Sequence, residues 1–378
     1  MSNWPGKFVI GLTGNIGTGK SVVRKMLEHL GAYGIDADAL AHRAMAKGAP
    51  GYKPVVDIFG KWILDPQGQI DRNKLGKLVF TDPDALANLE NIIHPLVAQA
   101  VDAIIQRASQ PVIAVEAIKL LEYTSLRQKC DIIWVVVAPE EVQAERLVTK
   151  RSMSREEALK RIRSQGSQED KKSAASIVIE NVGSFEDTWK QVVAAWKTAT
   201  PVPEAAPVEV ERAAEGKFSI IRGRPRDSAA IAQLITRLSH GTKTLNQGDI
   251  MAAFGEKAFL ILRLNKTPVG IAGWQVENLV ARTTDFYIDS SIELLPALKT
   301  LIAEVEQASQ DLQCEASLLF LPSNLATMET AWKQLGYERQ SPQTLGVQAW
   351  QDAAKESGPP NTILFFKQLR LDRILRPI

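Results

Sequence analysis

One stretch decides the fold of the first half of this chain: Gly14-Asn15-Ile16-Gly17-Thr18-Gly19-Lys20-Ser21. It matches the pattern G-x-x-x-x-G-K-[ST] at every fixed position. In such a loop, backbone N–H groups cradle a β-phosphate, Lys20 bridges the terminal phosphates, and the Ser21 hydroxyl binds Mg²⁺. An apolar run at 8–13 precedes the stretch, and an amphipathic helical pattern follows it. We therefore predict a loop that binds a nucleoside triphosphate with Mg²⁺, and we call residues 14–21 the phosphate loop.

Short apolar runs alternate with helical patterns across the first half of the chain. The expected strands lie at 8–13, 111–116, 131–138 and 176–180. Such β-branched runs, separated by helices, are typical of a parallel sheet covered by helices on both faces. We therefore expect an α/β domain over residues 1–198, built as a P-loop nucleotide-kinase-like sheet.

The composition changes at 199–217, where prolines stand among Ala, Glu and Val without periodicity, as in an extended linker. Beyond it, expected strands follow one another with little helix between them, at 218–222, 259–264, 270–277 and 282–288. A helix at about 294–310, a strand at 317–321 and a second helix ending near Gly336 complete the pattern. We therefore expect a second, α+β domain over 218–378.

Charge and apolar content exclude several functional classes. The 378 residues carry a net charge of only +2, which does not favour a nucleic-acid partner. Cys130 and Cys314 match no metal spacing and are typical of reduced thiols. The longest apolar run, 132–138, is far shorter than the roughly 20 residues of a membrane helix. We expect a soluble, cytoplasmic protein with a small-molecule substrate, and its oligomeric state stays open.

Asp36 and Asp38 come about one helix after the phosphate loop, where a second strand should end. Residues two apart in a strand point to the same side, so both carboxylates would face the crevice at the strands' carboxyl ends. One could take the proton of an attacking hydroxyl while the other holds Mg²⁺ through water. Equally, either aspartate could simply cap a helix that begins near Ala39.

Residues 7–197 resemble the dephospho-CoA kinases. The shared segments, in the family's order, are the phosphate loop, 35–38, 48–50, 91–95, 143–147, Arg151, 161–165 and 177–181. The resemblance implies ATP-dependent phosphorylation of the ribose 3′-hydroxyl of dephospho-CoA, the last step of coenzyme A synthesis. It also implies that Asp38 is the general base, with Asp36 beside it as a Mg²⁺ or positioning residue.

One segment departs from the family pattern. The usual segment after the third strand is like D-x-P-L-L-F-E, whereas this chain reads Glu116-Ala117-Ile118-Lys119-Leu120-Leu121-Glu122. Both acidic ends are kept, and we expect Glu116 to bind substrate. Ile118 and Lys119 replace the proline and one leucine, so the substrate contacts of this segment are open. Lys119 could meet a substrate phosphate or be solvated.

Basic residues crowd the helical stretch after 131–138. They are Arg146, Lys150, Arg151, Arg155, Lys160, Arg161 and Arg163. Arginines on a closing lid can neutralise the charge of phosphoryl transfer. The resemblance indicates Arg146 and Arg151 as the phosphate-contacting pair, whereas the others are typical of a solvated helix face. His94, before Pro95, is either a structural anchor or, by the same resemblance, a substrate contact.

Residues 218–370 resemble the GNAT N-acyltransferases. The segment 331–338 looks like that family's late helix, which ends in Leu-Gly-Tyr before a strand. The family's chemistry depends on a glycine-containing pyrophosphate loop after the fourth strand. Here that position reads Asp289-Ser290-Ser291-Ile292-Glu293-Leu294, without a glycine. We therefore expect this domain to be catalytically degenerate, with a packing or regulatory role.

The sequence thus predicts a dephospho-CoA kinase that uses ATP and Mg²⁺. The expected catalytic residues are Lys20, Asp38, Arg146 and Arg151; the expected substrate contacts are Asp36, His94 and Glu116; the expected metal ligands are Ser21 and Asp36. Two alternatives remain, a kinase for another small hydroxyl acceptor and a nucleotide-dependent switch without an acceptor. The paired aspartates and the basic stretch favour a kinase over a switch.

Overall fold

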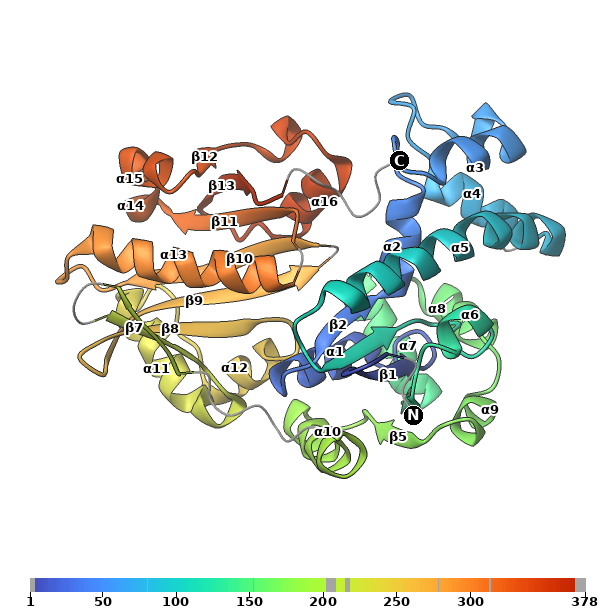
Figure 1. Cartoon of the computed structure of the whole chain (residues 1–378), viewed down its shortest axis with the longest axis horizontal. Helices are drawn as coiled ribbons and strands as arrows, with labels where there is room; N and C mark the ends of the chain where they lie inside the picture. Colours follow the sequence, from blue (N-terminus) through green and yellow to red (C-terminus); the bar gives the residue numbers. More distant parts are fainter. Residues whose placement is uncertain are drawn as a thin grey trace. The chain divides into compact units, whose positions relative to one another are not determined.

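A computed structural model describes residues 4–79, 81–151, 153–201, 209–214, 218–277, 279–312 and 314–370, without the side chains of 150, 151 and 209–214. The chain forms two compact units (Figure 1). The first contains the residues up to Lys20 together with Tyr33–Glu180, and the second contains Ser21–Ala32 together with Asn181–Leu371.

The first unit is built on a five-stranded parallel sheet. Its strands are β1 (Phe8–Thr13), β2 (Tyr33–Asp36), β3 (Val112–Glu116), β4 (Ile132–Val137) and β5 (Ile177–Glu180), in the order β2-β3-β1-β4-β5. All four pairings are parallel, so the carboxyl ends of the strands share one edge. The interior strands are almost fully buried, as their β-branched sequences require.

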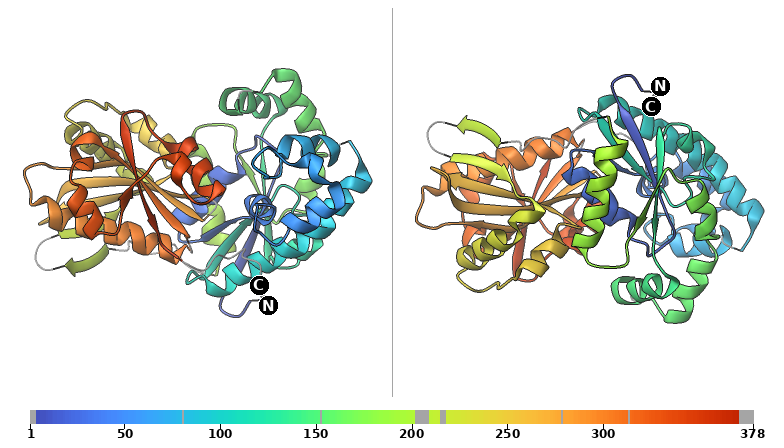
Figure 2. Two further views of the ribbon diagram at one scale, coloured as in Figure 1. Left: turned by 90° about the horizontal axis from the view of Figure 1, so that it is seen from above. Right: turned by 90° about the horizontal axis from the view of Figure 1, so that it is seen from below.

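Helices surround this sheet (Figure 2). They are α2 (Ala37–Ala44), α3 (Tyr52–Phe59), α4 (Arg72–Val79), α5 (Pro83–Arg107), α6 (Thr124–Arg127), α7 (Glu140–Arg151), α8 (Arg155–Arg163) and α9 (Gln168–Ser173), with a 3₁₀ turn at Lys61–Ile63. The parallel sheet with surrounding helices confirms the predicted α/β class. The longest helix, α5, begins where Asp82 accepts bonds from two backbone N–H groups, and it continues through Pro95.

One local expectation is wrong. Asp36 and Asp38 do not lie two apart in a strand, because β2 ends at Asp36 and Asp38 belongs to the first turn of α2. Asp36 Oδ1 accepts a hydrogen bond from the Ala39 N–H at 2.8 Å and so caps α2. The capping interaction stops the strand two residues earlier than expected.

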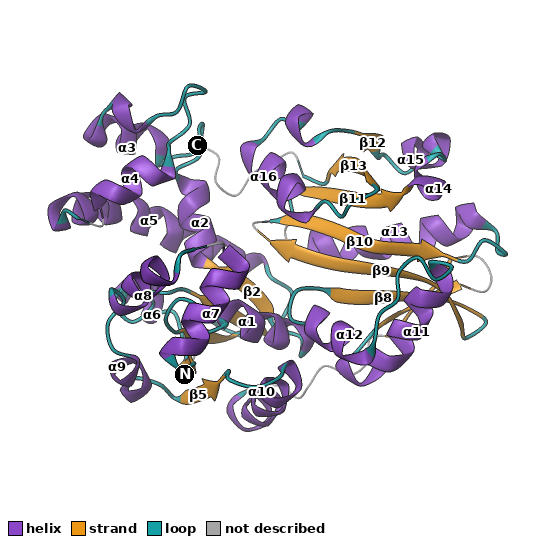
Figure 3. Cartoon of the chain, turned by 180° about the vertical axis from the view of Figure 1, so that it is seen from behind, coloured by secondary structure: helices purple, strands orange, loops and turns teal. Residues whose placement is uncertain are grey.

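The second unit contains an eight-stranded mixed sheet in the order β12-β13-β11-β10-β9-β8-β7-β6 (Figure 3). The strands are β6 (Glu209–Ala214), β7 (Phe218–Arg222), β8 (Ala258–Leu264), β9 (Thr267–Glu277), β10 (Val280–Ile288), β11 (Ala316–Pro322), β12 (Glu338–Arg339) and β13 (Thr362–Gln368). Among the described strands of this sheet, only β10 and β11 pair in parallel. The mixed sheet confirms the α+β prediction.

The helices of the second unit include α1, which begins within the phosphate loop. They are α1 (Lys20–His29), α10 (Phe185–Ala199), α11 (Ser228–Leu238), α12 (Gln247–Ala253), α13 (Leu294–Asp311), α14 (Ser323–Ala326), α15 (Glu329–Gln334) and α16 (Gln348–Ser357), with 3₁₀ turns at Pro225–Asp227 and Pro342–Thr344. Within this unit, the His29 ring nitrogen Nε2 lies 2.7 Å from the Phe254 carbonyl oxygen. Lys25 Nζ donates to the Val276 carbonyl at 3.0 Å.

Part of the expected linker forms regular structure. Glu209–Ala214 is strand β6, paired antiparallel with β7, whereas 202–208 and 215–217 lie outside the described residues. The composition of 199–217 carries no strand periodicity, so the pairing partner supplies the order. Among the helices that the structure describes, none combines the length and apolar character that crossing a membrane requires.

Candidate active site

The backbone of the phosphate loop requires glycine. Gly14, Gly17 and Gly19 have φ values of +150°, +78° and +89°, a region that glycine adopts readily. A Cβ on Gly14 would lie 2.2 Å from the Val136 carbonyl oxygen, and one on Gly17 would lie 2.9 Å from the Gln143 carbonyl oxygen. The glycines therefore let the loop approach neighbouring backbone that a side chain would push away.

The connection between α8 and α9 also holds the phosphate loop. Gln165 Oε1 accepts from the Ile16 N–H at 2.6 Å, and Asn15 Nδ2 donates to the Gly166 carbonyl at 3.1 Å. Thr18 Oγ1 donates to the Asn15 carbonyl at 2.8 Å inside the loop. The sequence indicated Gln165 only as part of a family segment, and the structure shows its contact with the loop.

Lys20 is buried at the end of the phosphate loop. Its side chain is 6% exposed, and Nζ donates to the Asn15 carbonyl at 3.3 Å. Ser21 follows as an exposed residue of α1. The positive charge of Lys20 stabilises the ionised form of Asp38 and so opposes other influences that raise the pKa of that carboxyl. The loop lysine and Asp38 therefore share one electrostatic environment.

Asp38 is a partly buried carboxylate with a backbone partner. Its Oδ2 accepts a hydrogen bond from the Ile118 N–H at 3.1 Å. Burial raises the pKa of Asp38 to about 6, and the negative charges of Asp36 and Glu116 act in the same direction. Lys20 and the Ile118 N–H oppose this rise in the pKa. Such a pKa suits a group that accepts a proton near neutral pH.

Glu116 ends β3 at the same sheet edge. It is 4% exposed, and its Cα partners are Leu12 in β1 and Asp36 in β2. Among the described residues, no three His, Cys, Asp or Glu side chains are grouped so as to hold a metal ion by themselves. Mg²⁺ usually takes one or two protein oxygens and completes its shell with water and substrate phosphates. The hydroxyl of Ser21 and the carboxylate of Asp36 are donors of that type.

Arg146 contacts the phosphate loop from α7. Its Nη1 lies 3.2 Å from the Gly17 carbonyl oxygen and 3.3 Å from the Thr18 carbonyl oxygen. Burial lowers the pKa of Arg146. Arg151 is the last residue of α7, and its side chain lies outside the described part of the chain. The structure thus places one arginine of the expected pair on the loop.

The other described arginines of this stretch form exposed ion pairs. Arg155 pairs with Glu141, Arg161 with Glu157 at 2.8 Å, and Arg163 with Glu140 at 2.8 Å. All these side chains are at least 40% exposed, so each pair contributes little to stability. They behave as the solvated helix face that the sequence indicated.

His94 lies in α5 and stacks on Tyr123. The ring centroids are 3.8 Å apart at 28°, and the Tyr123 hydroxyl donates to the His94 carbonyl oxygen. Burial lowers the pKa of His94 below its ordinary value, so the ring is neutral at neutral pH. Lys119 is 54% exposed and pairs with Glu90 at 2.8 Å. Both residues therefore connect the segment 116–123 to α5.

Lys171 is a site residue that the sequence analysis did not identify. It is 4% exposed on α9, and its Nζ donates to the Ile118 carbonyl at 3.2 Å. Burial lowers the pKa of Lys171, and the charge of Lys20 adds to this effect. Its neighbour Lys172 instead forms an ion pair with Glu169 at 2.8 Å. Because both lysines stand in one charged run, the sequence carries no signal that separates them.

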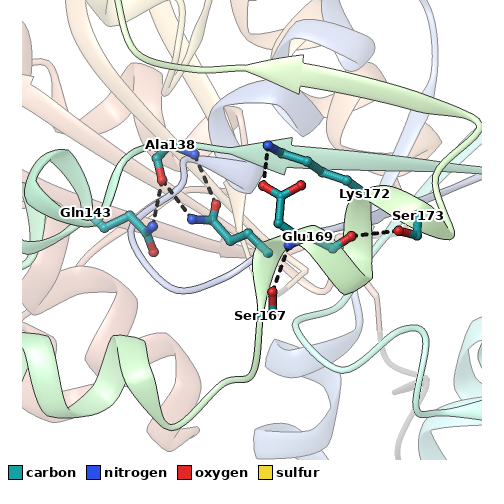
Figure 4. A network of polar contacts seen from close by, with 7 residues as sticks. Ala138, Gln143, Ser167, Glu169, Lys172 and Ser173 are labelled. Carbon is teal, nitrogen blue, oxygen red and sulfur yellow. Dashed lines mark hydrogen bonds and ion pairs between the residues drawn. The ribbon is translucent and has the colours of Figure 1, made fainter.

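Helix α9 is anchored beside the end of β4 (Figure 4). Gln168 accepts from the Ala138 N–H at 3.2 Å and donates to the Ala138 carbonyl at 3.0 Å. Gln143 Nε2 donates to the same carbonyl at 2.7 Å. The Ser167 hydroxyl oxygen accepts from the Glu169 N–H at 3.1 Å and caps the helix. These bonds hold in place the helix that carries Lys171.

Comparison with solved structures finds likenesses to each half. TT1252 from Thermus thermophilus is similar with a TM-score of 0.46 and 34% identity, covering 51% of this chain and 98% of that one. An acetyltransferase of the GNAT family from Staphylococcus aureus is similar with a TM-score of 0.34 and 13% identity, covering 40% of this chain and 99% of that one.

Sequence comparison identifies the family of the first half. A family model described as dephospho-CoA kinase matches residues 8–187. The dephospho-CoA kinase of Geobacter metallireducens is 44% identical over 192 residues, which cover 50% of this chain and 95% of the relative. That of Aquifex aeolicus is 43% identical over 194 residues, which cover 51% and 98%. The chain belongs to the dephospho-CoA kinase family.

Proposed function

We propose that the protein transfers the γ-phosphoryl group of ATP to the ribose 3′-hydroxyl of dephospho-CoA, which yields coenzyme A and ADP. The observation that carries this proposal is the partly buried Asp38 carboxylate within the field of Lys20, at the carboxyl ends of a parallel sheet. The kinase domain would extend over 1–198, followed by the connection 199–217 and a second domain at 218–378. We place the reaction in the cytoplasm.

The phosphate loop would bind the nucleotide. Its positive-φ glycines allow backbone N–H groups to point at phosphate oxygens, and Lys20 adds a charge beside them. Ser21 and Asp36 would hold Mg²⁺, which neutralises charge on the phosphates when it is bound. Arg146, whose Nη1 contacts the carbonyl oxygens of Gly17 and Thr18, would meet the transferring phosphoryl group. We assign the same role to Arg151 from its place in the family pattern.

Asp38 would act as the general base. As the ribose oxygen bonds to the γ-phosphorus, Asp38 takes the hydroxyl proton, and the bond from that phosphorus to the leaving oxygen of ADP breaks. With a pKa of about 6, the carboxyl is ionised at neutral pH and still accepts a proton. Glu116 and the neutral His94 would contact dephospho-CoA from β3 and α5.

The decisive measurement is ADP release by the purified chain with and without dephospho-CoA, coupled to chromatographic identification of coenzyme A. We expect release to require dephospho-CoA, and we expect nucleosides and shikimate to give no more than the background. Faster release with one of those acceptors would indicate a kinase of another specificity. ADP release at the full rate without any acceptor would instead indicate a nucleotide switch.

A further inference from the structure

The backbone of one residue, Ile118, joins three parts of the candidate site. The Ile118 N–H donates to Asp38 Oδ2 at 3.1 Å. The Ile118 carbonyl accepts from Thr13 Oγ1 at 3.0 Å and from Lys171 Nζ at 3.2 Å. Thr13 ends β1, Asp38 begins α2, and Lys171 lies on α9. The backbone of Ile118 therefore connects the proposed base to the strand that precedes the phosphate loop and to a buried cation.

The bond to Asp38 depends on the residue at position 118. Isoleucine has a backbone N–H, whereas proline has none and cannot donate this bond. A charged acceptor makes such a bond stronger than one between neutral groups.

Lys171 holds the carbonyl of Ile118, whereas Asp38 is bonded to the N–H of the same residue. An ammonium group that is 4% exposed needs hydrogen-bond acceptors, and the Ile118 carbonyl is one. Helix α9 is itself held by the two bonds between Gln168 and Ala138. The Ile118 carbonyl is therefore bonded from a well-anchored element.

We propose that the backbone of Ile118, held at its carbonyl by Lys171 and Thr13, is a positioning group for Asp38. Its N–H restricts rotation of the carboxylate by occupying Oδ2, which leaves Oδ1 to take the proton of the acceptor hydroxyl. The inference rests on the proposed function, because it assumes that Asp38 is the base. It assigns to Ile118 and Lys171 an effect on turnover, not on nucleotide binding.

The first test compares Ile118→Pro with the conservative variant Ile118→Val in the full chain. Ile118→Pro removes the donor, and we expect kcat to fall about tenfold or more, with the KM for ATP within about twofold of the parent. Ile118→Val keeps the N–H and is expected to retain most of the parent's turnover. Equal loss in both variants, or no loss in Ile118→Pro, would overturn the proposal. Melting temperature and ATP binding show whether Ile118→Pro is folded.

A second test asks whether the effect passes through Asp38. In an Asp38→Asn background, which lacks the base, Ile118→Pro should change the residual turnover by less than about twofold. A further tenfold fall there would show that Ile118 acts independently of Asp38 and would contradict the proposal. This cycle also remains informative if Ile118→Pro lowers stability, because a purely structural defect lowers turnover in both backgrounds.

A matched pair of lysines tests the contact between Lys171 and the Ile118 carbonyl. Lys171→Met keeps the apolar stem but removes the ammonium, and we expect kcat to fall about fivefold or more with little change in the KM for ATP. Lys119→Met removes an exposed lysine on the same segment as Ile118 and should have almost no effect. A raised KM with unchanged kcat in Lys171→Met would show that Lys171 binds nucleotide directly and would overturn its positioning role.

These tests separate the inference from the function on which it rests. If the parent chain shows no ADP release that depends on dephospho-CoA, the proposed function fails before any variant is made. If the parent is active, Asp38→Asn is inactive and Ile118→Pro is as fast as the parent, only the positioning role fails.

Discussion

Two loops of this chain join a strand to a helix, and they use their polar groups in opposite ways. The phosphate loop follows β1 and contains three glycines at positive φ, two of which lie too close to neighbouring carbonyls for a side chain. The loop at 289–293 follows β10 and contains none. There the Ser291 N–H and hydroxyl donate to Asp289 Oδ1 at 3.0 and 2.7 Å, and Arg237 pairs with Asp289 at 3.4 Å.

The difference teaches that strand–loop–helix topology does not by itself make an anion site. In the second loop, the Asp289 carboxylate accepts hydrogen bonds from the backbone N–H and hydroxyl of Ser291, so these donors are not directed at a phosphate. The negative charge of Asp289 also opposes an anionic ligand. The phosphate loop itself contains no acidic residue, and the proposed base, Asp38, lies outside it on α2. The two aspartates, Asp38 and Asp289, therefore provide a matched pair for experiments.

The largest expected effect comes from this pair. Asp38→Asn removes the proposed base, so we expect turnover to fall by about 10²- to 10⁴-fold while ATP still binds. Asp289→Asn should leave turnover within about twofold, since its side-chain partners are Ser291 and Arg237, which have no proposed role in phosphoryl transfer. Steady-state ADP release and ATP titration of both variants provide the measurement. Unchanged turnover in Asp38→Asn would remove it from the base role.

Glycine substitutions test the backbone half of the comparison. Gly14→Ala would place a Cβ 2.2 Å from the Val136 carbonyl oxygen, so the loop must shift. We expect at least a tenfold weaker affinity for ATP, about 1.4 kcal/mol or more, by calorimetry. Gly346→Ala is the control, because its Cβ would meet nothing within 4 Å. Normal ATP affinity in Gly14→Ala would show that the close approach is not required.

Helix α1, which follows the phosphate loop, carries a buried histidine whose pKa is shifted. α1 ends with His29, whose pKa is lowered to about 4, first by burial and then by the charge of Arg222. The unfolded chain binds a proton near pH 6.5 but the folded chain does not, so this contribution is complete above pH 6.5 and is lost as the pH falls toward 4.

We therefore expect His29 to lower the free energy of unfolding by about 1–2 kcal/mol between pH 7 and pH 5. Denaturant titrations at both pH values measure the change, and His29→Gln should reduce the pH dependence by that amount. An identical pH dependence in the parent and in His29→Gln would contradict the assignment.

The smallest expected effect is an absence. The hydrogen-bond donors of Ser291, in the loop at 289–293, are directed at Asp289. We therefore predict that the full chain binds no acetyl-CoA once dephospho-CoA saturates the kinase site. Isothermal titration with acetyl-CoA, in the presence and absence of dephospho-CoA, measures this. Saturable binding of acetyl-CoA in the presence of saturating dephospho-CoA would show that the second unit binds acyl-CoA despite its loop.

Local sequence was sufficient for several elements. The strands expected at 8–13 and 218–222 are β1 and β7 with the same bounds, because their apolar residues must be buried whatever their partners are. Sequence was insufficient where two local structures compete. Asp36 and Asp38 suited both a strand and a helix cap, and the cap on Ala39 N–H places Asp38 on α2. β6 forms only through its pairing with β7.

By itself, the sequence determined the phosphate loop, because its glycines, lysine and serine act through adjacent backbone and need no distant partner. The family pattern pointed to Asp38 in the same way. Only the tertiary structure decided what surrounds that carboxylate. Ile118 lies 80 residues from Asp38, and Lys171 lies 53 residues from Ile118, yet the N–H of Ile118 bonds to the first and its carbonyl to the second. No local pattern encodes such contacts, because they arise when β1, β3, α2 and α9 pack at one edge of the sheet.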